Sequence, residues 1–119
     1  HALAYPLGGH FHVPHGLSNT LMLPHVLRHN MEAAMPLYAE LGRWLDPSLA
    51  AQGQQAQAVG LITRLERLAQ ATGLPQRLRE VGVTPRDLNA LARDAMKQER
   101  LLINNPCPIT LADARRLYE

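Results

Sequence analysis

The chain has 119 residues, of which 46% are hydrophobic and 18% charged, and its formal net charge is +2 with neutral histidines. This composition is typical of a globular protein. Acids and bases are interspersed, which argues against the concentrated basic stripe that nucleic acids require. No apolar run approaches the roughly 20 residues of a membrane helix, and we recognise no signal peptide. The single Cys107 excludes an internal disulfide framework and a cysteine-rich zinc finger, so we expect a cytoplasmic protein.

The segment 1–15 is expected to form the end of one element, a turn and the approach to a helix. This stretch is interrupted by Pro6, Gly8, Gly9 and Pro14. The chain opens on His1 rather than on a methionine, and we therefore expect it to be a fragment of a longer protein.

A deeply buried helix is predicted from Gly16 to about His29, because apolar residues cover most of its circumference. Leu21 and Leu23 are both expected in the core. Pro24 lies inside this helix and is expected to bend it.

A second, shorter helix is predicted from Pro36 to about Leu45, since proline is favoured at the first helical position. Its expected inner face consists of Leu37, Tyr38, Leu41 and Trp44. A loop over 46–53 follows.

The clearest periodicity predicts a helix from about Gln54 to Thr72, with Gly73 and Pro75 as its stop. Its expected inner face carries Leu61, Leu65, Leu68 and Thr72.

Two start signals mark the last part of the chain. Thr84, Pro85 and Asp87 predict one helix, after a short helical turn over 76–80, and Thr110 with Asp113 predicts another that runs to Tyr118. No alternation of strands and helices and no glycine-rich phosphate loop is visible. We therefore predict a single all-α domain over residues 1–119, a bundle of about five or six helices.

All the histidines of the chain lie between His1 and His29. Neutral imidazole is a common ligand of divalent metals. His1 and His15 flank the first turn, which can bring them together as half of a metal site. A catalytic metal needs three or more protein ligands, so the rest of the site would lie outside this chain. A histidine beside a turn is more often a surface or capping residue, and structural roles are favoured for His25 and His29.

The segment His1-Ala-Leu-Ala-Tyr5-Pro-Leu-Gly-Gly-His10-Phe-His-Val-Pro-His15-Gly, followed by Leu-Pro-His-Val-Leu-Arg-His-Asn over 23–30, resembles the iron-containing alcohol dehydrogenase family. The Asn105-Pro106 pair before the last helix also resembles it. The similarity spans nearly the whole chain, and the segment 1–30 is its most specific part.

The resemblance implies that His1 and His15 bind the catalytic metal, Fe²⁺ or Zn²⁺. The family's other two ligands, an aspartate and a histidine, and its nucleotide-binding domain are absent from this sequence. Tyr5 stands where many members have a catalytic histidine, and His10 falls in the segment that faces the cofactor cleft. The implied function is part of an NAD(P)-linked dehydrogenase that interconverts a small alcohol with an aldehyde or ketone, the fragment alone being inactive.

Two other interpretations remain open. The chain could be a non-enzymatic helical interaction domain with structural histidines. A helix-turn-helix DNA binder is disfavoured, because the arginines after residue 85 are mixed with acids. The helical face that would meet the absent domain is expected to be apolar and exposed, which favours a homo-oligomer.

Overall fold

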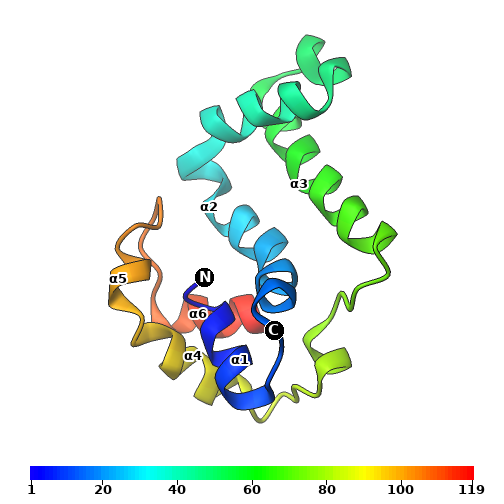
Figure 1. Cartoon of the computed structure of the whole chain (residues 1–119). Coiled ribbons are helices and arrows are strands. Elements are labelled where there is room, and N and C mark those ends of the chain that lie inside the picture. Colours follow the sequence, from blue (N-terminus) through cyan, green and yellow to red (C-terminus); the bar gives the residue numbers. More distant parts are fainter.

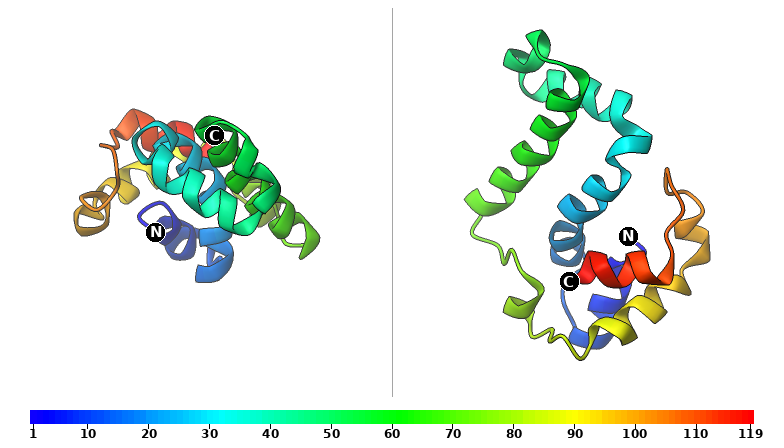
Figure 2. Two further views of the ribbon diagram at one scale, coloured as in Figure 1. Left: turned by 90° about the horizontal axis from the view of Figure 1, so that it is seen from above. Right: turned by 180° about the vertical axis from the view of Figure 1, so that it is seen from behind.

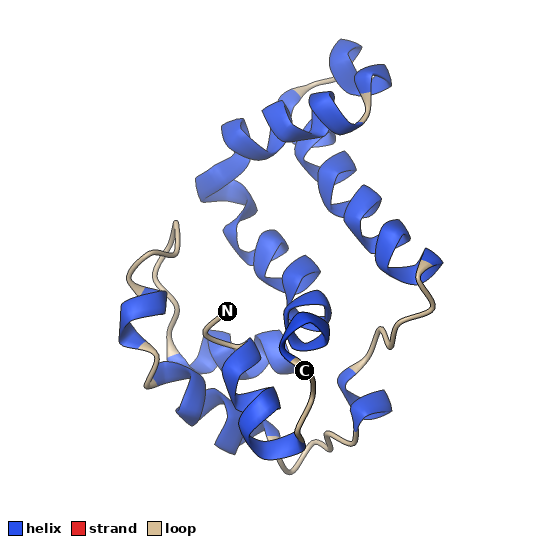
Figure 3. Cartoon of the chain, in the orientation of Figure 1, coloured by secondary structure: helices blue, strands red, loops and turns tan.

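The computed structural model describes all residues 1–119, and its regular structure is entirely helical (Figure 3). The elements are α1 (Ala4–Phe11), α2 (His15–Leu45), the 3-10 helix η1 (Pro47–Ala51), α3 (Gln54–Ala71), the 3-10 helix η2 (Leu78–Val81), α4 (Leu88–Met96), α5 (Glu99–Leu102) and α6 (Leu111–Tyr118). The prediction of an all-α fold with five or six helices is confirmed. No helix is long and apolar enough to cross a membrane.

The helices form a lower group and a projecting hairpin (Figures 1 and 2). Helices α1, α4 and α6 lie together with the first part of α2. The rest of α2 leaves this group and pairs with α3, which returns toward it. A long connection through η2 joins α3 to α4.

The segment 1–15 differs from the prediction, because most of the expected turn is helix α1. Pro6 is the third residue of this helix, where a backbone N–H has no partner inside the helix anyway. Burial of Leu7, which is fully inaccessible, stabilises the helix across the two glycines that follow. The chain turns at His12, whose φ of 54° is left-handed and whose N–H donates to the Gly8 carbonyl.

The two helices predicted on either side of residue 30 are one helix, α2, with Pro24 and Pro36 inside it. Pro36 is therefore not a first helical position. Packing of buried Ala34 and Tyr38 against α3 favours a helical path on both sides of Pro36 and outweighs its missing hydrogen bond. The helix changes direction along its length in Figure 1, as proline-containing helices do.

The main core joins the two ends of the chain. It contains Ala2, Leu3, Leu7, Val13, Leu21, Met22, Val83, Leu88, Leu91, Ala92, Ala95, Ala114 and Tyr118. The Tyr118 hydroxyl donates to the Leu3 carbonyl at 2.6 Å, and burial raises the pKa of Tyr118. Helix α6 thus fixes the segment that follows His1.

Not every residue assigned to the core from periodicity is buried. Leu21 is 4% exposed but Leu23 is 43% exposed, and Leu37, Trp44 and Leu68 are 57%, 72% and 61% exposed. Periodicity placed helices over these residues but did not show which apolar side chains would lack neighbours. Leu37 and Trp44 lie toward the outer end of the hairpin, and Leu23 and Leu68 lie on exposed faces of α2 and α3.

In the second half of the chain, the predicted stop of α3 and the predicted start of α6 agree with the structure. The start signal of Thr84, Pro85 and Asp87 lies before the helix that it was expected to begin, since α4 starts at Leu88 and the Asp87 side chain makes no capping hydrogen bond. Gly73 and Gly82 adopt left-handed φ values of 70° and 91° after α3 and η2. Thr110 and Asp113 form a reciprocal capping box at the start of α6. Hydrogen bonds from the Thr110 side chain and backbone lower the pKa of Asp113 to about 2. The short helix α5 was not predicted.

The hairpin closes on a close approach between Gly42 and Gln57. Gln57 is buried, and its side-chain amide donates to the Gln52 carbonyl at 2.8 Å and to the Leu49 carbonyl at 3.1 Å. Its side-chain oxygen accepts from Arg43 at 2.7 Å. These bonds satisfy the carbonyls of the turn between α2 and α3.

We expect Gly42→Ala to destabilise the protein, because an added Cβ would lie 2.3 Å from the Gln57 carbonyl oxygen. The backbones must then separate, at a cost of about 1–3 kcal/mol. Gly9→Ala in α1 is the matched control: a Cβ there meets nothing within 4 Å. It should raise the free energy of unfolding by roughly 0.5–1 kcal/mol. Urea denaturation of both variants measures the contrast, and equal effects would show that the hairpin does not close at Gly42.

Candidate metal centre

The fold brings His1 and His15 together. The His1 carbonyl accepts hydrogen bonds from Ala4 and Tyr5 at the start of α1, and His15 is the first residue of α2. The short turn after α1 reverses the chain, so the two imidazole ring centroids lie 5.3 Å apart. Two histidines at opposite ends of the first helix and its turn thus face each other.

This arrangement fits a shared metal ion. With metal–nitrogen bonds of about 2.0–2.1 Å in tetrahedral geometry, two imidazole centroids lie about 5 Å apart. No group of three or more His, Cys, Asp or Glu residues in the chain is placed to hold a metal. The chain therefore offers two neighbouring imidazole ligands, and a catalytic site would need further ligands from outside it.

Two side chains surround His15. The Tyr5 ring centroid lies 5.5 Å from the His15 ring, and its side chain is partly exposed. One helical turn further on, the side-chain amide nitrogen of Asn19 lies 3.2 Å from His15 Nε2. Asn19 Oδ1 is buried and has no hydrogen-bond partner. Sequence reasoning included Tyr5 but missed Asn19, although its i+4 spacing from His15 was a usable signal.

His10 lies apart from this pair. Its Nε2 is 2.5 Å from Asp94 Oδ2, which links α1 to α4. Lys97 approaches the other carboxylate oxygen at 2.6 Å, and hydrogen bonds from Lys97 and then His10 lower the pKa of Asp94. The predicted contact of His10 with a cofactor stays a prediction.

His25 and His29 do not belong to the His1–His15 pair. His25 lines a cavity of about 690 Å³, and burial, followed by the charge of Arg28, lowers its pKa. His29 is partly buried, and its Nε2 has no hydrogen-bond partner. Another, smaller cavity of about 210 Å³ is lined by His1 together with apolar residues of α2, α5 and the segment before α6.

A polar cluster behind this smaller cavity was not predicted. The Asn30 and Asn105 side-chain amides exchange two hydrogen bonds of 2.7 Å, and the Cys107 thiol donates to Asn30 Oδ1 at 3.1 Å. Asn105 also lines the cavity beside His1. These bonds hold the segment before α6 against α2, and so fix one wall of that cavity.

The chain is thus a helical protein with a pair of neighbouring imidazoles and a cavity beside them, which together form a candidate metal site. Residues 1–119 match the C-terminal part of the Fe-containing alcohol dehydrogenase family. The chain therefore belongs to this family and corresponds to its C-terminal part.

Known relatives agree with this assignment. Long-chain-alcohol dehydrogenase 1 of Geobacillus thermodenitrificans (strain NG80-2) is 35% identical over 119 residues, 100% of this chain and 30% of the relative. Lactaldehyde reductase of Escherichia coli (strain K12) is 31% identical over 99% of this chain and 31% of its own length. The crystal structure of a 1,3-propanediol oxidoreductase superposes with a TM-score of 0.93 at 30% identity, over 99% of this chain and 31% of that one. The chain spans about a third of these proteins.

Proposed function

We propose that residues 1–119 form the metal-binding helical domain of an NAD(P)-linked alcohol dehydrogenase, which interconverts a small alcohol with an aldehyde or ketone. The observation that carries the proposal is the pair of His1 and His15 rings, 5.3 Å apart at the position where the family resemblance expects two metal ligands. The names of the relatives, among them a lactaldehyde reductase and a long-chain-alcohol dehydrogenase, support an alcohol or aldehyde substrate.

His1 and His15 would hold the metal, Fe²⁺ or Zn²⁺. The bound ion would act as a Lewis acid that polarises the oxygen of the substrate. With its side-chain oxygen turned to accept from the Nε2–H of His15, Asn19 would orient the ring and leave Nδ1 for the metal, as partners of metal-binding histidines commonly do. Tyr5, beside His15, would contact the reacting end of the substrate, and its phenol can donate a hydrogen bond there. His10 is proposed to face the nicotinamide cofactor while its Nε2 is paired with Asp94.

The remaining parts of the activity would come from a longer protein. Its other segments would supply two further ligands and the nucleotide-binding domain, since the relatives are about three times as long as this chain. A cytoplasmic location and assembly into a homo-oligomer belong to the same proposal.

A hybrid enzyme tests the proposed dehydrogenase function. Residues 1–119 replace the matching C-terminal third of the 1,3-propanediol oxidoreductase to which they are structurally similar. We expect the hybrid to bind metal and to form NADH from NAD⁺ and a primary alcohol. We expect the isolated chain to bind Zn²⁺ weakly in a calorimetric titration and to form no NADH, since it offers two ligands. Tight metal binding with turnover by the chain alone, or a folded, metal-free and inactive hybrid, would contradict the proposal.

A further inference from the structure

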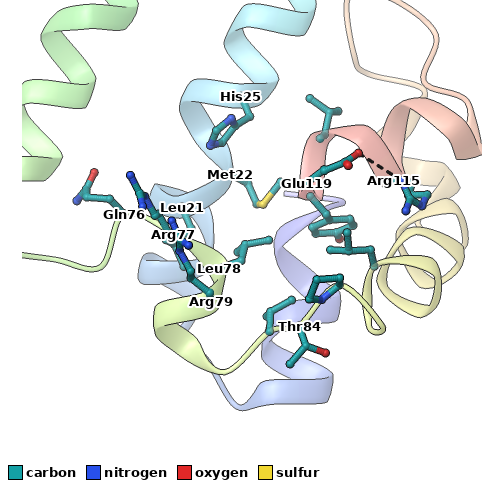
Figure 4. A pocket seen from close by; sticks show the side chains of 15 residues that line it. Leu21, Met22, His25, Gln76, Arg77, Leu78, Arg79, Thr84, Arg115 and Glu119 are labelled. Carbon is teal, nitrogen blue, oxygen red and sulfur yellow. Dashed lines mark hydrogen bonds and ion pairs between the residues drawn. The ribbon is translucent and has the colours of Figure 1, made fainter.

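The larger cavity is separate from the His1–His15 pair. It has a volume of about 690 Å³ and lies between the first half of α2, the segment around η2, and the end of α6 (Figure 4). This volume is in the range of small-molecule pockets, roughly 300–1,000 Å³. Neither His1 nor His15 lines it. We call it the arginine cavity, after Arg77, Arg79 and Arg115 in its wall.

The floor of the arginine cavity is apolar and rigid. It is formed by side chains that also belong to the main core or pack against it, namely Leu21, Met22, Leu78, Val83, Leu88, Leu117 and Tyr118. Because these side chains are fixed by packing on their other side, the floor is preformed and can bury a hydrocarbon chain without reorganisation.

The arginines in the cavity wall differ in whether their side chains have hydrogen-bond or ion-pair partners. Arg115 donates to Glu119 at 3.3 Å and to Asn89 at 3.0 Å. Arg77 and Arg79, on the other side of the cavity in Figure 4, make no ion pair and no side-chain hydrogen bond. The neighbouring Glu80 accepts from the Gln76 backbone N–H at 3.1 Å instead. Two unpaired guanidinium groups therefore border an apolar floor, and the only carboxylate side chain in the lining, Glu119, is already paired.

We propose that the arginine cavity binds a single-chain amphipathic anion, with its carboxylate or phosphate group at Arg77 and Arg79 and its hydrocarbon chain on the apolar floor. Guanidinium groups bind carboxylates and phosphates through paired, charge-assisted hydrogen bonds. The chain contributes affinity in proportion to the apolar area that it buries. Neither half of the ligand suffices by itself, because exposed charge pairs alone are weak.

Calorimetric titration of the isolated chain with dodecanoate tests this site. We expect saturable binding of one dodecanoate per chain, and much weaker binding of butanoate, which lacks the long chain, and of dodecan-1-ol, which lacks the charge. The double variant Arg77→Gln/Arg79→Gln should bind dodecanoate about tenfold more weakly. Dodecyl phosphate should compete with dodecanoate, since both carry an anion on the same chain.

The control variant Arg67→Gln/Arg93→Gln removes the same charge from exposed positions that do not line the cavity. It should bind dodecanoate as the unchanged chain does. Equal weakening in both double variants would overturn the proposal, because only net charge would then matter. It would also be overturned by no binding of dodecanoate, by equal binding of dodecan-1-ol, or by binding only to vesicles of anionic phospholipid. Circular dichroism of each variant confirms that the helices are retained.

Discussion

Replacing His15 with alanine in the hybrid enzyme is expected to remove most of the bound metal and to lower kcat/KM by more than about 100-fold. Loss of a residue that merely orients a metal ligand typically costs about 10–100-fold, so loss of a ligand itself should cost more. His15 sits at the start of α2 and is exposed, so its side chain contributes little to the core. The loss should therefore appear in metal content, measured by atomic absorption, and in rate, while the melting temperature of the metal-free protein stays unchanged.

The control for this experiment is His12→Asn. His12 is another exposed histidine of the same turn, and asparagine tolerates its left-handed φ of 54°. This variant should keep both metal and rate. If the His15→Ala hybrid retained its metal and its kcat/KM, or if His12→Asn lost as much, the pair of His1 and His15 would not be the metal site.

The sequence predicted only part of the candidate metal site. The clustering of histidines before residue 30 and the resemblance around them pointed to His1 and His15, and the fold brings these rings together. The segment between His1 and His15 differs from the expected one, because it is a helix rather than a loop. Local rules for Pro6 and the two following glycines predicted a turn, and the burial of Leu7 outweighs those rules.

Local chemistry predicted the start of α6, but the similar signal of Thr84 and Asp87 precedes α4 without capping it. Thr110 and Asp113 bond to each other within one helical turn, so the sequence contains the whole interaction. The pairing of Asn30 with Asn105 joins distant parts of the chain, and no local pattern reports such a bond. The arginine cavity was missed for the same reason, since its wall combines α2, the η2 segment and α6.

The second large effect is expected at Leu21. This side chain is 4% exposed and belongs to the main core, so Leu21→Ala should lower the free energy of unfolding by about 2–4 kcal/mol. This loss has two causes: fewer apolar atoms are removed from water on folding, and a cavity is left where the leucine side chain was. Urea denaturation of the isolated chain, followed by circular dichroism, measures it.

Leu23 supplies the matched comparison, because it lies on the same helix, close to Leu21, and is 43% exposed. Leu23→Ala removes the same atoms from a partly solvated position, and alanine favours the helix slightly, so the change should stay within about 0.5 kcal/mol. Leu21 and Leu23 are two residues apart and so lie on nearly opposite sides of α2, and the packing of α1, α4 and α6 covers only Leu21. Equal losses at both positions would mean that the face of α2 bearing Leu23 is covered in the folded protein, and the orientation of α2 against the main core would then be wrong.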